Sequence, residues 1–199
     1  IISTGMANLN EIMDAVQAAR EGGCEELALL HCVSGYPAPA VDYNLATMVD
    51  LARRFDVPVG LSDHTIDNTT ATASVALGAS IIEKHFTLDR NGGGPDDSFS
   101  LEPSEFKALC RDALTAWKSI GAVDYGLKSS ERANSVFRRS LYAVQDIPAG
   151  AVITTQNVRS IRPGYGLAPK HLDAVLGSVA LQDIAYGQAM RWDLIETKA

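Results

Sequence analysis

Two short apolar runs in this sequence each end in a histidine with a charged residue close before it. Asp63 precedes His64 in the first run, and Glu83 lies two residues before His85 in the second. The runs are VPVGLSDHTI, residues 57–66, and ASIIEKHFTL, residues 79–88. Because an unpaired polar group is costly inside a strand, we expect these clusters where the strands emerge from the sheet. Two imidazoles there could converge on one divalent metal, with a carboxylate as ligand or ring acceptor. Two hydrogen-bonded histidines fit the same spacing.

Other polar residues near the predicted strand ends could bind an anion or a hydroxylated ligand. Ser3 and Ser62 are donors suited to phosphate or carboxylate, although turn formation explains a single serine equally well. The loop GGGPDDSFSLEP places Asp96 where it could hydrogen-bond a polyol, and a plain linker is the alternative. Further on, Arg162 adjoins a Pro-Gly turn, from which it is either solvated or reaches a ligand across an interface.

Strand and helix patterns alternate over residues 1–122. The predicted strands are IIS, ELALLHCVS, VPVGLSDHT and SIIEKHFTL, each followed by a predicted helix, in order NLNEIMDAVQAAREGG, YNLATMVDLARRFD, NTTATASVALGA and PSEFKALCRDALTAWKSIG. Strands this apolar indicate a parallel sheet, either doubly wound or part of a closed (β/α) barrel. No Gly-x-Gly-x-x-Gly motif follows a strand, which disfavours dinucleotide binding. The polar residues fall at strand C-termini, where barrel enzymes keep their active sites. A complete barrel has eight strands, so the barrel interpretation predicts that the first half is missing from this chain.

The pattern changes in the last third of the chain. Residues 123–136 are polar and weakly periodic, and we interpret them as a linker. Residues 137–199 contain short β runs separated by Pro, Gly and Asp turns, with one helical piece at PKHLDAVLG. The segments DIPAGAVIT and DIAYGQAM are imperfect copies of one turn pattern. We therefore predict a separate small β-rich domain.

Composition and charge narrow the function classes. The 199 residues are 46% hydrophobic and carry a formal net charge of −7, with 24 acidic and 17 basic side chains. That balance argues against nucleic acid as the main partner, since phosphate backbones require a basic face. Three scattered cysteines predict neither a CxxC metal site nor a disulfide framework, and favour the cytoplasm. The apolar runs are far shorter than the roughly 20 residues that a membrane span requires.

Several motifs, in this order along essentially the whole chain, resemble the sialic acid synthase family, which includes N-acetylneuraminate, legionaminate and pseudaminate synthases. The motifs are STGM, LLHCVSGYPAP, GLSDHT, IIEKHFTLDR, RRSLYAVQDIPAG and VRSIRPGYGLAPKHLD. The resemblance implies an α/β fold in which a (β/α)8 TIM barrel precedes a small antifreeze-like SAF domain of the β-clip type. It also implies a homodimer in which each SAF domain covers the partner's barrel. The implied activity is a C–C bond-forming transfer from phosphoenolpyruvate to an acylamino-sugar, giving a nine-carbon 2-keto sugar acid and phosphate.

The resemblance also implies roles for residues at the strand ends. His64 and His85 match histidines that hold a divalent metal, which would be Mn²⁺ with Mg²⁺ or Co²⁺ as alternatives. These two histidines and Glu83, beside the metal and the reacting sugar, form the implied catalytic group. Ser3 and Ser62 match residues that contact phosphoenolpyruvate.

Four further matches concern the sugar. Tyr36 and Ser34 would face the acylamino-sugar, with Ser34 at a position where some sialate synthases have Asn. Asp96 matches an aspartate that binds sugar hydroxyls. Arg162 matches an arginine that the small domain supplies, from its own chain or from the partner.

Within the family, GPDDSFSLEPSEF and RSIRPGYGL are most like pseudaminic acid synthases. The sugar would then be 2,4-diacetamido-2,4,6-trideoxy-altrose, for flagellin or surface-polysaccharide glycosylation. N-Acetylneuraminate and legionaminate synthases are the alternatives. The family's early strands carry a catalytic glutamate and two lysines that are absent here, so we expect a truncated enzyme that is inactive alone. A non-catalytic SAF-domain module with a vestigial half-barrel is the alternative from another class.

Overall fold

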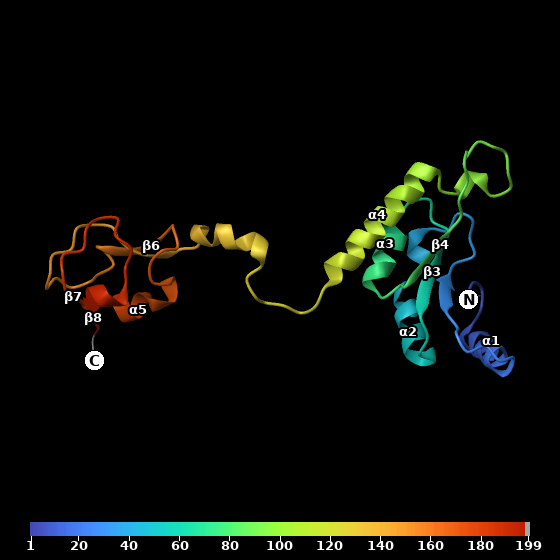
Figure 1. Cartoon of the computed structure of the whole chain (residues 1–199), viewed down its shortest axis with the longest axis horizontal. Helices are drawn as coiled ribbons and strands as arrows, with labels where there is room; N and C mark the ends of the chain where they lie inside the picture. Colours follow the sequence, from blue (N-terminus) through green and yellow to red (C-terminus); the bar gives the residue numbers. More distant parts are fainter. Residues whose placement is uncertain (198–199) are drawn as a thin grey trace. The chain divides into compact units, whose positions relative to one another are not determined.

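The computed structural model describes residues 1–197 and divides into two compact units (Figure 1). The first is Ile1–Val123 and the second begins at Asp124. Each unit has its own buried apolar clusters.

The first unit is a parallel four-stranded sheet in which strands alternate with helices. In chain order the elements are β1 (Ile2–Ser3), α1 (Leu9–Glu21), β2 (Leu29–Cys32), η1 (Ala40–Asp42), α2 (Ala46–Phe55), β3 (Val59–Asp63), α3 (Thr69–Ala76), β4 (Ile81–Lys84), η2 (Asp97–Phe99) and α4 (Pro103–Ile120). The strand order in the sheet is β1-β2-β3-β4. A doubly wound sheet reverses its order at a switch point, whereas a barrel adds each strand beside the last. The sequential order of these four strands is the topology of part of a (β/α) barrel, and it favours the barrel over the doubly wound alternative.

Side-chain alternation gives the sheet two different faces. Leu29 and Val59 are register partners on β2 and β3, and both pack with Met48 of α2 in one buried cluster. Leu61, two residues after Val59, packs with Leu109 of α4 in a second cluster. Since successive side chains on a strand point to opposite faces, the residues between these belong to the other face, here called the inner face.

The inner face is closely packed near its centre. Leu30 and Gly60 are register partners on this face. A Cβ atom on Gly60 would lie 2.6 Å from Cδ2 of Leu30 and 2.4 Å from the carbonyl oxygen of Ile81. Any side chain at position 60 would clash with Leu30 and with the backbone of β4, and this is a reason for glycine within the strand.

Local sequence signals explain where α1 begins. The Asn8 side chain accepts hydrogen bonds from the backbone N–H groups of Asn10 and Glu11 at 2.9 and 3.2 Å. The Glu11 carboxylate accepts the Asn8 N–H at 2.7 Å, which completes a capping box. Asparagine is among the few residue types whose side chain accepts hydrogen bonds from the backbone N–H groups that are left unpaired at the start of a helix.

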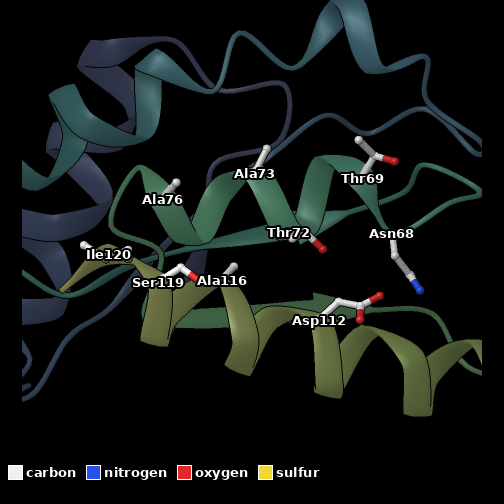
Figure 2. Close-up of a pocket in the computed structure, with 9 residues that line it drawn as sticks. All are labelled: Asn68, Thr69, Thr72, Ala73, Ala76, Asp112, Ala116, Ser119 and Ile120. Carbon is white, nitrogen blue, oxygen red and sulfur yellow. The ribbon is translucent and has the colours of Figure 1, made fainter. Parts of the chain in front are cut away.

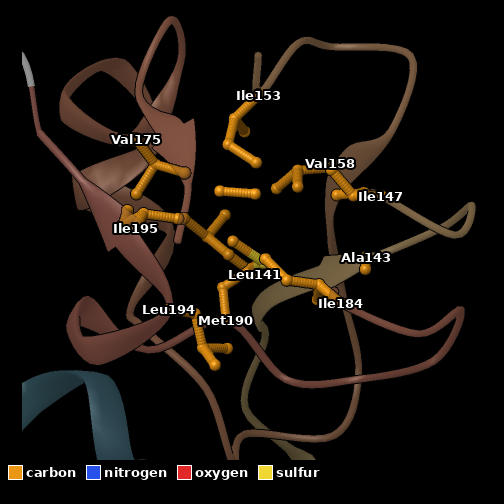
Figure 3. Packing of buried hydrophobic residues seen from close by; sticks show 11 residues of the cluster. Leu141, Ala143, Ile147, Ile153, Val158, Val175, Ile184, Met190, Leu194 and Ile195 are labelled. Atoms are coloured by element: carbon orange, nitrogen blue, oxygen red, sulfur yellow. The ribbon is translucent and has the colours of Figure 1, made fainter. Parts of the chain in front are cut away.

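The second unit is built from short elements around an apolar cluster. They are η3 (Ser129–Phe137), β5 (Ser140–Ala143), β6 (Val158–Ile161), η4 (Pro169–His171), α5 (Leu172–Val175), β7 (Val179–Ala180), η5 (Trp192–Leu194) and β8 (Ile195–Glu196). Strands β5 and β6 pair antiparallel, as do β7 and β8. Leu141, Ile153 and Met190 are among the 11 residues whose packing fills the space between these strands (Figure 3). The 3-10 helix η3 takes up residues 129–136 of the segment that the sequence predicts as a linker and ends at Phe137.

The two imperfect sequence copies in this unit make reciprocal contacts. The Asp146 carboxylate accepts the backbone N–H of Tyr186 at 2.7 Å, and the Asp183 carboxylate accepts that of Ala149 at 2.8 Å. In each case the aspartate of one copy binds the equivalent position of the other. The repeated Asp-Ile-x-x-Gly pattern therefore encodes one two-fold-like crossing of the chain rather than two independent turns.

No helix in residues 1–197 is both long and apolar enough to cross a bilayer.

Candidate functional site

Three successive residue pairs at the C-terminal ends of β3 and β4 make up the centre of the candidate site. Ser62 pairs with Glu83 in the register of the sheet, and its hydroxyl donates to the Glu83 carboxylate at 2.7 Å. The next pair is Asp63 with Lys84, whose Nζ lies 2.8 Å from Oδ2 of Asp63. One residue further along each strand stand the two histidines. Because side chains alternate, the first pair and the histidines belong to the inner face, and the ion pair belongs to the helix-covered face.

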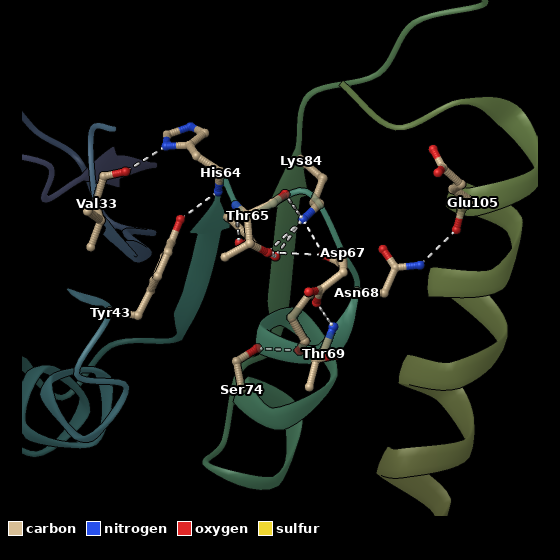
Figure 4. A network of polar contacts seen from close by, with 12 residues as sticks. Val33, Tyr43, His64, Thr65, Asp67, Asn68, Thr69, Ser74, Lys84 and Glu105 are labelled. Carbon is tan, nitrogen blue, oxygen red and sulfur yellow. Dashed lines mark hydrogen bonds and ion pairs between the residues drawn. The ribbon is translucent and has the colours of Figure 1, made fainter. Parts of the chain in front are cut away.

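His64 is fixed at three atoms by the segment that follows β2, and Figure 4 shows the contacts with Val33 and Tyr43. Its backbone N–H donates to the Tyr43 hydroxyl at 2.6 Å, and its carbonyl oxygen accepts the N–H of Ala38 at 3.0 Å. Its ring Nδ1 lies 2.8 Å from the carbonyl oxygen of Val33. The residue is only 5% exposed. These contacts hold both the backbone and the ring of His64 in one orientation.

The hydroxyl of Tyr43 is itself deeply buried. Tyr43 is 1% exposed, and this burial raises the pKa of its hydroxyl, with the nearby Asp63 charge acting in the same direction. The hydroxyl is therefore protonated at neutral pH. It accepts the amide of His64 and keeps its own proton.

Four rings surround the inner ends of β3 and β4. The ring centroids of His64 and His85 are 5.2 Å apart. Tyr36 lies 4.4 Å from His64 and 5.7 Å from His85, and Phe99 lies 5.1 Å from His85. Asp96 is close as well, with Oδ2 at 3.6 Å from Nδ1 of His85. The structure thus brings together four of the residues selected from the sequence, His64, His85, Tyr36 and Asp96.

The loop that carries Asp96 and Phe99 is organised by the neighbouring aspartate. The Asp97 carboxylate accepts the Thr87 hydroxyl at 2.6 Å and the backbone N–H of Gly94 at 2.7 Å. These hydrogen bonds, the Thr87 bond first, hold the pKa of Asp97 below its usual range. Asp97 is thus occupied within the loop, whereas the Asp96 carboxylate is exposed beside His85.

The serines occupy three different positions. Ser62 is 2% exposed and is bonded to Glu83, as described above. Ser3 is exposed on β1 and is the register partner of Leu30, which places it on the inner face. Ser34 follows β2, and a Cβ atom on Gly5 would lie 2.2 Å from its hydroxyl oxygen. Ser34 therefore lies against the turn that follows β1.

Asp63 does not have the role that its sequence position suggested. The ion pair with Lys84 holds it on the helix-covered face, and its Oδ1 accepts the N–H of Thr65 at 2.8 Å. The hypothesis that Asp63 orients an imidazole or serves as a ligand is wrong for this geometry. Of the two carboxylates proposed for that role, Glu83 is the one on the inner face.

The imidazoles of His64 and His85 can supply two of the ligands that a divalent metal needs. A backbone carbonyl can only accept a hydrogen bond, so Nδ1 of His64 carries the proton and Nε2 keeps its lone pair for a ligand. His85 supplies a second imidazole close by. In residues 1–197, however, no group of three or more His, Cys, Asp or Glu side chains is clustered as a complete metal site would require. The residues fit two nitrogen ligands, and further ligands would have to come from substrate or water.

Arg162 lies in the second unit, on a loop that is tied to its surroundings. The Ser140 hydroxyl donates to the carbonyl oxygen of Pro163 at 2.7 Å and accepts the N–H of Gly166 at 2.9 Å. Ser140 is 1% exposed, whereas Arg162 is exposed. The guanidinium is therefore presented to solvent from a fixed loop.

A groove of about 730 Å³ lies elsewhere in the first unit, between α3 and α4 (Figure 2). Its lining includes small residues such as Ala73 and Ala116, together with Asp112. None of the candidate-site residues lines it. The groove is a feature of helix packing and is separate from the candidate site.

Sequence reasoning missed three residues that shape the site. Phe99 was part of a loop noted only for its aspartates, although an aromatic residue in a polar Gly-rich loop was a signal. Tyr43 and Lys84 act through buried polar contacts across the fold, and no local spacing pattern predicts these.

Comparison with known proteins identifies the relatives of this chain. The NeuB family matches residues 1–125, and the SAF domain matches residues 138–196. A pseudaminic acid synthase of Campylobacter jejuni is 40% identical over 96% of this chain and 56% of its own length. An N,N'-diacetyllegionaminic acid synthase of the same species is 39% identical over 96% of this chain and 58% of its own length. This chain thus spans little more than half the length of these relatives.

Solved structures agree with these matches. The spore coat polysaccharide biosynthesis protein SpsE of Bacillus subtilis is 32% identical, with a TM-score of 0.57 over 100% of this chain and 61% of its own. The partial barrel and the small β domain that the sequence predicts are confirmed by these matches and by the topology. The chain belongs to the NeuB family and carries a SAF domain.

Proposed function

We propose that this chain provides half of the catalytic site of a pseudaminic acid synthase. The reaction condenses phosphoenolpyruvate with 2,4-diacetamido-2,4,6-trideoxy-altrose and releases phosphate. The observation that carries the proposal is the convergence of His64, His85, Tyr36 and Asp96 beside the Ser62–Glu83 pair. Names of relatives support a synthase of this group, and the 40% and 39% identities to pseudaminic and legionaminic acid synthases do not separate the two sugars.

In this proposal the histidines hold a divalent metal, with Mn²⁺ expected and Mg²⁺ or Co²⁺ as alternatives. When bound, the metal would act as a Lewis acid towards the aldehyde oxygen of the sugar. His64 contributes Nε2, because Nδ1 is engaged by Val33. His85 is the second ligand.

The remaining inner-face residues bind and orient the substrates. Ser62 and Ser3 donate to phosphoenolpyruvate. Glu83, whose carboxylate is positioned by the Ser62 hydroxyl, lies where it can exchange a proton with the reacting sugar. Binding both reactants at the C-terminal edge of the sheet replaces their encounter in solution by a reaction within one complex, which lowers the entropic cost of the reaction.

The sugar contacts come from the loops around this edge. Tyr36 presents an aromatic face that packs against the C–H groups of the sugar. Asp96 accepts from sugar hydroxyls, and Ser34 faces the acylamino group. Arg162 binds the sugar from the small domain of the partner chain in a homodimer.

The proposed domain organisation is a catalytic half-barrel over residues 1–122, a linker over 123–136 and a SAF domain over 137–199. We place the reaction in the cytoplasm, where the free thiols of Cys24, Cys32 and Cys110 would stay reduced.

The test uses protein made from the complete gene that encodes these residues, with Mn²⁺ and phosphoenolpyruvate. Phosphate release is followed with the diacetamido-trideoxy-altrose, with the corresponding diacetamido precursor of legionaminic acid, and with N-acetylmannosamine. We expect release with the first sugar and its loss in His64→Ala. Release with only one of the other sugars would keep the synthase and change the substrate. Release with none of the sugars would overturn the proposal in favour of a non-catalytic module.

A further inference from the structure

We propose that the buried Asp63–Lys84 pair is a positioning device that sets the spacing of His64 and His85 for the divalent metal. The inference rests on the proposed function, because it concerns the same two histidines. The pair itself is not part of the reacting group. It acts on the histidines through the backbone of the two strand ends.

The Lys84 ammonium is enclosed by oxygen atoms. Its side chain is 2% exposed and that of Asp63 is 0% exposed. Besides Asp63, Nζ donates to the carbonyl oxygens of Thr65 at 2.6 Å and Asp67 at 2.7 Å (Figure 4). The Thr65 hydroxyl lies 3.2 Å away. A buried charge is tolerated only when it is paired and fully hydrogen-bonded, and this one is.

These contacts lie on both sides of His64 along the chain. The residue before it, Asp63, binds Nζ through its carboxylate, and the residue after it, Thr65, binds Nζ through its carbonyl. The same ammonium belongs to the residue immediately before His85. One side chain therefore fixes the backbone that flanks both histidines.

The location of the Asp63–Lys84 pair excludes a direct role of either side chain in the reaction. Asp63 and Lys84 are register partners whose side chains point to the helix-covered face, opposite the imidazoles. Neither can touch a substrate on the inner face. A pair with a purely stabilising role would need no particular relation to the histidines. In this pair, each residue lies immediately before one of the two histidines in the sequence.

The experiment compares metal affinity with stability in the protein made from the complete gene. Mn²⁺ binding is measured by electron paramagnetic resonance, and unfolding by urea. Lys84→Met leaves the Asp63 charge buried without a partner, so we expect lower stability together with weaker Mn²⁺ binding. The double variant Asp63→Asn with Lys84→Met removes both charges, and we expect it to recover most of the stability. Its Mn²⁺ affinity should stay about 10- to 100-fold below wild type, as for other groups that orient metal ligands.

Two controls make the outcomes distinct. Leu51→Ala opens a cavity between α2 and the sheet, in a buried cluster that contains neither His64 nor His85. It should lower stability with Mn²⁺ affinity unchanged. Recovery of Mn²⁺ affinity together with stability in the double variant would overturn the inference and leave a structural role only. Failure of the wild-type protein to bind Mn²⁺ would instead overturn the metal assignment in the proposed function.

Discussion

The ring Nδ1 of His64 lies 2.8 Å from the carbonyl oxygen of Val33, and this contact decides which nitrogen can bind a ligand. In His64→Asn, the side-chain amide nitrogen takes the place of Nδ1, and nothing replaces Nε2. We expect this variant to keep the hydrogen bond to Val33 and a urea midpoint close to wild type. It should lose Mn²⁺ binding, measured by electron paramagnetic resonance.

The matched control for this prediction is His31, a buried histidine one residue before the end of β2. His31 is 8% exposed, and its Nε2 contacts the carbonyl oxygen of Tyr43 on the helix-covered face. His31→Ala removes this buried contact, so it should lower stability and leave Mn²⁺ binding intact. If His64→Asn binds Mn²⁺ as tightly as wild type, His64 is a structural histidine like His31.

The buried hydroxyl of Tyr43 should make the free energy of unfolding depend on pH in the alkaline range. Burial raises the pKa of its hydroxyl in the folded state above the ordinary tyrosine value of about 10. Above that value the unfolded chain releases the proton and the folded protein keeps it, so the free energy of unfolding falls as pH rises. The Tyr43 contribution is fully present below pH 10 and is lost as pH approaches the folded-state pKa. Urea unfolding at pH 8 and at pH 10.5 should show a smaller drop for Tyr43→Phe than for wild type.

The same variant has a cost at neutral pH. Tyr43→Phe leaves the buried N–H of His64 without an acceptor, and an unsatisfied buried donor costs about 1–3 kcal/mol. Equal pH slopes for wild type and Tyr43→Phe would contradict the protonated, buried hydroxyl.

Asp96 and Asp97 are adjacent and should respond differently to substitution. Asp96 is exposed beside His85 and can accept from a sugar hydroxyl, so Asp96→Asn should raise the sugar KM about tenfold, the equivalent of one charged hydrogen bond, with the phosphoenolpyruvate KM unchanged. Asp97 holds the loop through Thr87 and Gly94, so Asp97→Asn should loosen the loop. We expect Asp97→Asn to increase protease cleavage within residues 90–97, and Asp96→Asn to leave cleavage unchanged. Similar cleavage of both variants would show that Asp97 does not organise the loop.

The sequence predicted the fold well because its signals are local. The alternation of apolar strands and amphipathic helices, and the capping group at Asn8, depend on residues close in the chain. It also placed His64 and His85 at strand ends, since parallel strands bring such residues to one edge. It could not separate Asp63 from Glu83, because the two differ only in which face of the sheet they point to. That face depends on the pleat of each strand, and the partner of Asp63, Lys84, lies on the neighbouring strand.

Arg162 provides the last prediction, which concerns two chains. It is exposed on a fixed loop of the second unit, and we propose that it serves the catalytic site of a partner chain. His64→Ala destroys the site in one barrel, and Arg162→Ala removes the arginine from one small domain. If the arginine acts in the partner, a mixed dimer of these variants contains one intact site, made from the barrel of one chain and the small domain of the other.

Co-expression of the two variants tests this arrangement, at a sugar concentration low enough that neither variant alone releases appreciable phosphate. About half of the dimers are then mixed and each has one intact site of two, so we expect about one quarter of wild-type phosphate release. An arginine that acts within its own chain leaves every site in the mixed dimer with one defect, and the mixture stays as inactive as its parents. Co-expression of wild type with each variant in turn provides the control for the formation of mixed dimers. The fraction of intact sites in those mixtures follows from the same counting. Recovered activity thus requires both a dimer and an exchanged small domain, whereas a single-chain arrangement cannot produce it.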